Sequence, residues 1–169
     1  MKYLRKLENN DASNMLEWMH DPNVNCNFRV DFSKMTLDDV KDFIQNSLDE
    51  KNQHFAIVDE KNEYMGTISL KNINRTDNNA EYAIVTRAVA HGKGFALEAT
   101  KEILNYAFNE LKLHKVYLNV LEENIRANKF YEKCGFRFEG MSKEFLYING
   151  KYHNLNWYAV EDNCSKITN

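Results

Sequence analysis

The sequence predicts a mixed α/β fold, and three observations support that class. Short alternating apolar runs, typical of strands, are interspersed with longer stretches in which apolar residues recur at helical spacing. The order along the chain is a strand, two helices, three strands, a helix, a strand, a helix and two strands. With 169 residues, 43% of them hydrophobic, and one proline, the sequence can supply one core and contains no evident linker. We therefore expect one domain over residues 1–169.

The first part of the chain is predicted to hold one strand and two helices. Tyr3 to Leu7 alternates as a short strand. Asp11 is a candidate N-cap for a helix that Asp21-Pro22 ends. Residues 23–32 are expected to be irregular and aromatic. A second helix is predicted to begin at Thr36, because two acids follow in its first turn.

The middle of the chain changes to the period of strands. Residues 55–58 and 64–70 are predicted to form a hairpin, and a third strand is expected over residues 80–85. The next stretch, roughly Gly94 to Leu111, carries a helical apolar stripe.

The last part of the chain is predicted to contain three strands and one helix. Strands are expected over residues 116–120, 136–145 and 152–160, with a turn at Asn149-Gly150. A helix beginning at Asn124 is stopped by a glycine.

Composition excludes several classes of protein. A formal charge of −3 and a pI near 6.0 argue against nucleic-acid binding. No window of about eighteen apolar residues is present, and the first residues lack the apolar segment of a signal peptide. Cys26, Cys134 and Cys164 are widely spaced, so we expect reduced thiols in a cytoplasmic protein and no metal site. The tail, residues 161–169, is expected to fray.

The segment from His91 to Ala96 is the first motif that suggests a function. Gly92 and Gly94 flank Lys93, follow an apolar run and open a helix. Glycines permit a tight turn, and a helix N-terminus offers unpaired amides, so this arrangement suits a phosphate or pyrophosphate. It matches neither common nucleotide fingerprint, since Leu97 stands where a third glycine would be. A plain tight turn before a core helix is the alternative.

A second motif, about thirty residues later, favours the functional interpretation. With it the chain resembles the GNAT superfamily of acetyl-CoA-dependent N-acyltransferases. The family's first pattern is [Arg/Gln]-x-x-Gly-x-[Gly/Ala], in which x is any residue. Gly94 and Ala96 match its last two defined positions, and His91 stands where the family has arginine or glutamine. The second pattern is matched by Asn124, Ala127, Phe130, Tyr131, Gly135 and Phe136. The resemblance implies a mostly antiparallel seven-stranded sheet, splayed between its fourth and fifth strands and flanked by about four helices.

The resemblance also implies how acetyl-CoA is held. The strand before the glycine turn would pair with the extended pantetheine arm. Asn124 would hydrogen-bond that arm, although a plain N-cap role is equally available to it. The positions implied to bind the cosubstrate are Ile84, Val85, Thr86, His91, Gly92, Lys93, Gly94, Phe95, Ala96 and Asn124. His91 departs from the family pattern, and its charge near pH 7 is open.

Acetyl transfer to an amine needs a base for the ammonium proton and an acid for the leaving thiolate. By resemblance, Tyr131 is the candidate acid, with core packing as the alternative, and its unperturbed pKa near 10 suits the task. Glu81 is the candidate base, with a solvated strand-edge acid as the alternative. His54 is a rival base, while Cys134 is expected to have a packing role.

The acceptor is less defined by the sequence. The resemblance places Phe28, Arg29 and Tyr82 on the acceptor side; ordinary hydrophobic packing is the alternative. The chain looks similar to the branch that acetylates ribosomal-protein N-termini, amino-sugar nucleotides and polyamines. A primary amine is therefore the expected acceptor, and relatives of this kind suggest a homodimer. A non-catalytic module that binds CoA as a sensor is the competing function.

Overall fold

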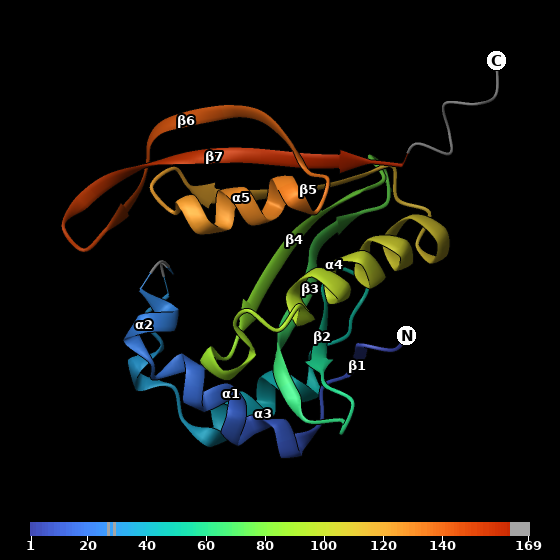
Figure 1. Ribbon diagram of the computed structural model, residues 1–169, viewed down its shortest axis with the longest axis vertical. Helices are drawn as coiled ribbons and strands as arrows, with labels where there is room; N and C mark the ends of the chain where they lie inside the picture. Colours follow the sequence, from blue (N-terminus) through green and yellow to red (C-terminus); the bar gives the residue numbers. More distant parts are fainter. Residues whose placement is uncertain (27, 29, 163–169) are drawn as a thin grey trace.

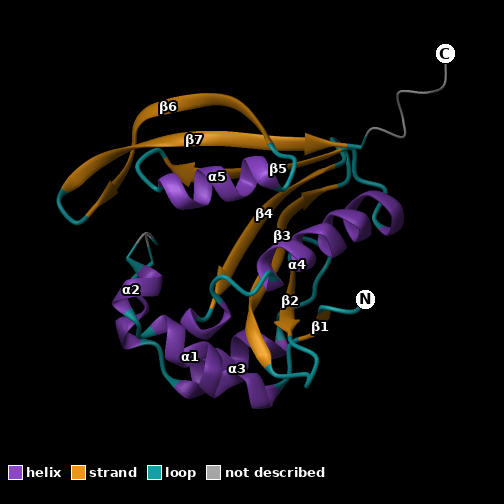
Figure 2. Cartoon of the chain, viewed as in Figure 1, coloured by secondary structure: helices purple, strands orange, loops and turns teal. Residues whose placement is uncertain are grey.

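The computed structural model describes residues 1–26, 28 and 30–162, and it confirms the mixed α/β class with one seven-stranded sheet (Figures 1 and 2). The strands are β1 (Leu4–Lys6), β2 (Gln53–Val58), β3 (Tyr64–Asn74), β4 (Asn79–Thr86), β5 (Lys115–Leu121), β6 (Arg137–Ile148) and β7 (Lys151–Glu161). The α-helices are α1 (Ala12–Met19), α2 (Pro22–Asn25), α3 (Leu37–Gln45), α4 (Phe95–Asn105) and α5 (Ile125–Lys133). The order of strands across the sheet is β1-β2-β3-β4-β5-β7-β6.

The sheet is antiparallel except where β4 meets β5. These two strands are parallel, and their pairing runs only from Asn79 opposite Lys115 to Glu81 opposite Tyr117. Beyond Glu81, β4 continues to Thr86 without a partner on that side, while β5 goes on pairing with β7. The predicted splay between the fourth and fifth strands is therefore present, and Figure 1 shows β4 diverging from the β5–β7 layer.

Two apolar clusters hold the helices against the two faces of the sheet. One joins the sheet to α4 and the inner side of α5, through Ala99, Ile103 and Tyr131 among others. The other joins the opposite face to α1 and α3, through Met15, Trp18 and Val40. Since successive strand residues point to opposite faces, Tyr82 in the first cluster and Val85 beside the second mark the two sides of β4.

Most predicted helix starts have the expected capping, with one correction. Thr36, the predicted start of the second helix, is the N-cap of α3 and forms a capping box with Asp39. Asp11 is the N-cap residue of α1 as predicted, but its side chain makes no capping bond there: it is 4% exposed and accepts two hydrogen bonds from Arg5, at 2.7 and 2.8 Å. The same carboxylate also accepts from Glu8 N at 2.9 Å, so Arg5 and the amide of Glu8 use its oxygens in place of the first amides of α1.

The aromatic segment predicted to be irregular contains short α2 and a 3-10 turn at Phe32–Lys34. The helix expected to reach Leu111 changes at Tyr106–Glu110 into a π-helical turn, in which Leu111 N donates to Tyr106 O at 3.0 Å.

The last strand extends one residue further than predicted. Glu161, predicted to open a frayed tail, is the last residue of β7. Residues 163–169, with Cys164, lie outside the described residues, as do Asn27 and Arg29. Cys26 and Cys134 are free thiols. In the described part of the chain, no helix is long and apolar enough to cross a membrane.

Candidate active site

The unpaired side of β4 is the first component of the site. Ile84, Val85 and Thr86 lie beyond the last β4–β5 pair and are half-buried. Their pairing to β3 is intact up to Thr86 opposite Gly66. A strand that is paired on one side and open on the other can accept an extended ligand as its missing neighbour.

Gly66 brings β3 unusually close to this part of β4. A Cβ atom added there would lie 2.3 Å from Val85 O and 2.9 Å from Thr86 Cα. Only glycine fits that approach, because both contacts are to backbone that cannot rotate away. The sequence analysis did not predict this close approach. Its one signal in the sequence is a glycine inside a strand pattern.

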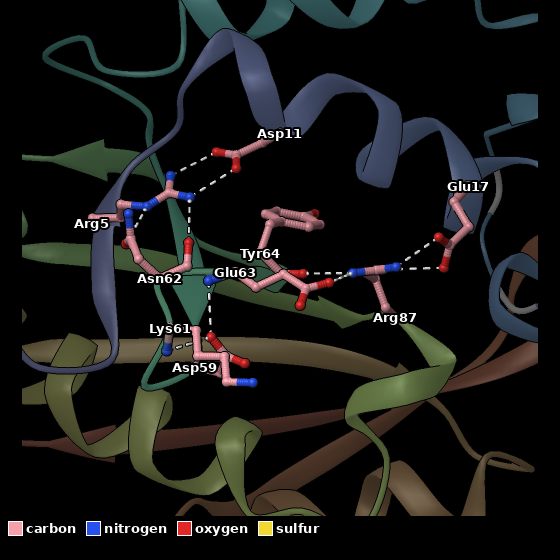
Figure 3. Close-up of polar contacts among 9 residues, drawn as sticks. All are labelled: Arg5, Asp11, Glu17, Asp59, Lys61, Asn62, Glu63, Tyr64 and Arg87. Carbon is pink, nitrogen blue, oxygen red and sulfur yellow. Dashed lines mark hydrogen bonds and ion pairs between the residues drawn. The ribbon is translucent and has the colours of Figure 1, made fainter.

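Arg87 anchors the end of β4 just before the glycine turn (Figure 3). Its side chain is 9% exposed and donates to Glu17 of α1 at 2.7 and 3.1 Å, to Glu63 at 3.1 Å and to Tyr64 O at 3.0 Å. These bonds tie α1 and the β2–β3 turn to the strand that leads into the site. A buried guanidinium that is paired with two carboxylates holds the end of β4 in one position relative to α1 and the β2–β3 turn.

The glycine turn lies between a 3-10 turn at Ala88–Ala90 and the start of α4. Gly92 and Gly94 have φ of 75° and 85°, a left-handed conformation that glycine adopts at little cost. Within the described residues, the backbone amides of Gly92, Gly94, Phe95 and Ala96 donate no hydrogen bond. Together with the helix dipole they form a set of donors suited to an anion.

His91 is exposed at the start of this turn. Partial burial lowers the pKa of its imidazole and the Arg126 guanidinium on α5 lowers it further, which outweighs the opposite effects of a hydrogen bond to the Thr86 backbone and of the Asp21 charge. The ring is therefore mostly neutral near pH 7 and can donate one hydrogen bond without a full charge. Arg126, which the sequence analysis did not single out, brings a permanent cation beside this turn from another helix.

Asn124 and Asn128 set the position of α5. Asn124 Oδ1 accepts from Ala127 N at 3.2 Å, so its N-cap role is confirmed. Asn128 is 8% exposed. Its amide donates to the carbonyls of Leu121 and Asn124 at 3.0 and 2.8 Å, and its Oδ1 accepts from Asn156 Nδ2 and the Tyr158 hydroxyl at 2.9 and 3.0 Å.

Tyr131 projects from α5 into the aromatic cluster. Its ring lies 6.0 Å from those of Tyr82 and Phe136, centroid to centroid, and 6.5 Å from that of Tyr158. Burial, with Cys134 nearby, raises the pKa of its phenol to about 12. Its hydroxyl has no hydrogen-bond partner in the described part of the chain. The group is thus protonated at neutral pH and has a donor to offer.

Tyr82, which was expected to line the acceptor site, is instead buried in the core. Its side chain is 2% exposed, and its hydroxyl lies 2.8 Å from Thr100 Oγ1. Because Thr100 donates its own proton to Ala96 O at 2.6 Å, Tyr82 is the donor of this pair. Burial raises the pKa of Tyr82 well above its usual value. The residue belongs to the core that joins β4 to α4, where its side chain is shielded from solvent.

Glu81 occupies the last paired position of β4, on the face opposite to Tyr82 and Tyr131. Its carboxylate is 19% exposed and accepts from Lys71 Nζ at 3.0 Å and from Asn72 Nδ2 at 2.8 Å. Tyr117, its neighbour on β5, has a pKa raised by burial and by the charge of Glu81. The candidate acid and base therefore lie on opposite sides of the splay.

The other sequence-predicted residues lie farther from this point. His54 is on β2, where its Nδ1 lies 2.7 Å from Ser69 Oγ and its ring packs on Phe43 of α3. Phe28 packs its ring against Trp18 and Phe32. Arg29 lies outside the described residues, so its expected acceptor role stays a prediction.

A further hollow of about 530 Å³ lies on the Glu81 face of the sheet, between β5, β6 and β7. Lys115, Tyr117 and Trp157 contribute to its lining, and Lys115 pairs with Glu139 at 2.7 Å. It lies beside Asn79 and Lys115, the first pair between β4 and β5, and therefore far along β4 from Thr86. In the described part of the chain, no group of three or more histidine, cysteine or acidic residues could hold a metal.

A splayed α/β sheet with a glycine turn at a helix N-terminus, and a tyrosine of the next helix packed beside the splayed strand, is typical of acyl-CoA-dependent acetyltransferases. Residues 3–137 match the family model described as the acetyltransferase (GNAT) domain. The chain belongs to this family, and it is an acetyl-CoA-dependent N-acetyltransferase that acetylates an amine.

Individual members of this family are similar to the chain over most or about half of its length. Spermidine N(1)-acetyltransferase of Vibrio cholerae is 33% identical over 156 residues, covering 90% of this chain and 88% of that protein. The putative ribosomal N-acetyltransferase YdaF of Bacillus subtilis is 33% identical over 95 residues, covering 56% and 52%. A crystal structure of the Vibrio cholerae spermidine enzyme in complex with CoA and spermine superposes with a TM-score of 0.85 at 30% identity and covers 94% of each chain. Another structure of that enzyme is described as a complex with manganese ions, so the expected lack of a metal here stays a prediction.

Proposed function

We propose that this enzyme acetylates a polyamine such as spermidine, by direct attack of a primary amine on acetyl-CoA in a ternary complex. The observation that carries the proposal is the placement of Tyr131 and Glu81 on opposite faces of β4, beside the point where β4 and β5 separate. The acceptors of the similar spermidine enzymes support the choice of amine.

The cosubstrate would be held mainly by backbone. Its extended arm would lie along β4 from Ile84 to Thr86, on the side opposite β3, where the described part of β5 makes no pair with these residues. Its pyrophosphate would face the unpaired amides of the glycine turn, with positive charge from Lys93 and Arg126. Asn124 would contact the arm through its amide nitrogen, since its Oδ1 already caps α5. The donor set fits a diphosphate without requiring His91 to be charged.

The reaction needs no covalent protein intermediate, since a thioester is already activated. Glu81 would accept the ammonium proton, directly or through a water, to leave a neutral amine. As the new C–N bond forms, the C–S bond breaks and the thiolate leaves. Tyr131 would give that sulfur its phenolic proton, which solvent then replaces.

The raised pKa of Tyr131 refines this role. At about 12 it lies roughly three units above that of an ordinary thiol, so complete transfer of the phenolic proton is uphill even to the fully formed thiolate. The phenol therefore acts first as a hydrogen-bond donor to the sulfur as charge develops there. Because no group in the described part of the chain hydrogen-bonds to this hydroxyl, the donor is available for this contact.

The proposal is tested by release of free thiol from acetyl-CoA with a panel of acceptors. The panel contains spermidine, peptides with ribosomal-protein N-termini and amino-sugar nucleotides, each beside a control without acceptor. Turnover is expected with spermidine. Turnover with a peptide or sugar nucleotide alone would reject the polyamine, and failure to bind acetyl-CoA would reject the arrangement proposed for the cosubstrate.

A further inference from the structure

Both oxygens of the Glu81 carboxylate are engaged by a neighbouring strand. Lys71 is its direct partner across β3 and β4, and Lys71 Nζ lies 3.0 Å from Oε1. Asn72 follows Lys71, yet its amide reaches Oε2 at 2.8 Å. This is possible because the β3–β4 register shifts after Lys71 and Asn72 has a φ of 51°. A bulge thus turns two consecutive side chains toward one carboxylate.

This arrangement conflicts with the work proposed for Glu81. A carboxylate that receives a proton from the acceptor ammonium must offer that ammonium a lone pair. In the structure a primary ammonium is already bound there, and it belongs to the protein. Lys71 has the same charge and the same N–H donors as the group that the acceptor would bring.

We propose that Lys71 is a built-in competitor for the acceptor amine: it occupies Glu81 in the free enzyme and is displaced when a substrate amine binds. The inference rests on the proposed function, since it takes Glu81 to face the acceptor. Lys71 therefore sets both the affinity for amines and the choice among them.

The surroundings of Lys71 allow this exchange. Its side chain is 35% exposed, against 19% for Glu81, so the lysine can move into water while the carboxylate stays in place. Lysine is a point charge on a flexible stem and lacks the rigid fork that makes arginine pairs hard to break. Asn72 is exposed as well and can continue to hold Oε2.

The competitor predicts a preference among acceptors. A polycation gains nothing from Lys71 and must push it aside against like charge. An amine that carries a carboxylate or phosphate nearby can instead pair with the displaced lysine. Removal of Lys71 should therefore help spermidine more than it helps an anionic amine.

The experiment compares Lys71→Met with the wild type, varying spermidine at saturating acetyl-CoA and, in a second series, acetyl-CoA at saturating spermidine. The KM for spermidine should fall roughly five-fold, the size expected for loss of one half-exposed ion pair. The KM for acetyl-CoA should not change, because the glycine turn is untouched. Lys71→Arg should keep the wild-type KM for spermidine or raise it.

Lys115→Met is the matched control. Lys115 lies on β5, on the same face of the sheet, and is 31% exposed, but it pairs with Glu139 instead of Glu81. If the KM for spermidine fell equally in Lys115→Met, the loss of one positive charge from this face would explain the effect, and the inference would be overturned. An unchanged or raised KM in Lys71→Met would also overturn it.

A separate measurement distinguishes this inference from the proposed function. If the wild type turns over no amine, the proposed acceptor fails, and spermidine binding to the CoA-bound protein is then measured by calorimetry. Tighter binding to Lys71→Met than to the wild type would still support the competitor. Equal or absent binding in both proteins would reject it.

Discussion

Replacing Tyr131 by phenylalanine separates a catalytic role of this residue from a structural one. The substitution removes one hydroxyl and leaves the ring between Tyr82, Phe136 and Tyr158. The hydroxyl has no hydrogen-bond partner in the described part of the protein, so its loss should change the free energy of unfolding by less than about 0.5 kcal/mol.

The expected effect on catalysis is much larger. A hydrogen bond to a charged group contributes about 1.5–3 kcal/mol, so loss of the donor to the developing thiolate should lower kcat about 10- to 150-fold. The KM for acetyl-CoA should stay near the wild-type value, because backbone groups hold that substrate. Thiol release and urea unfolding of the same preparations give both quantities.

Tyr158→Phe provides the opposite pattern. This change removes a hydroxyl from the same cluster, but one that donates to the buried Asn128 Oδ1 at 3.0 Å. It should cost about 0.5–1.5 kcal/mol of stability while kcat changes little. A fall in kcat of less than about three-fold in Tyr131→Phe, or a loss of stability equal to that of Tyr158→Phe, would refute a catalytic phenol.

Three other perturbations address the surrounding structure. Gly66→Ala should cost about 1–3 kcal/mol and raise the KM for acetyl-CoA, since its Cβ would meet Val85 O at 2.3 Å; unchanged kinetics would mean that β4 does not hold the arm. Asn128→Ala should lower the free energy of unfolding by about 1–3 kcal/mol, because it removes the side-chain bonds to two carbonyls that keep their backbone donors and leaves Asn156 Nδ2 without its acceptor; denaturation in urea measures this. Burial, with the Lys71 charge, lowers the pKa of His54, so the unfolded chain binds its proton first and stability falls as pH drops below about 6.5. Between about pH 7.5 and 5.5 the wild type should lose more stability than His54→Asn, and an equal loss would contradict the assignment.

The sequence was sufficient for the elements whose pattern is local. The strands from β2 to β5 and helices α3, α4 and α5 appear where periodicity and capping predicted them. The glycine turn and the Asn124 motif were readable for the same reason, because each is built from consecutive residues. The family resemblance then predicted the splay, which no single segment encodes.

The contacts that decide chemistry were not predictable in this way. Lys71 meets Glu81 only through the register of two strands, and a bulge adds Asn72. Asn128 is buried because its partners come from β7, about thirty residues away. Tyr82 was placed with the acceptor on its aromatic character, whereas strand alternation turns it into the core.

The short parallel seam has a consequence for motion and stability. Only three residue pairs, Asn79–Glu81 with Lys115–Tyr117, join the β1–β4 layer to the β5–β7–β6 layer within the described sheet. A ligand bound along Ile84 to Thr86 would lengthen that junction, and anything that binds only the native state raises its stability by mass action. Acetyl-CoA would then act as a structural strand as well as a reactant. Amide hydrogen exchange in β4 beyond Glu81 would slow on its binding, and the two layers would unfold more nearly as one cooperative unit.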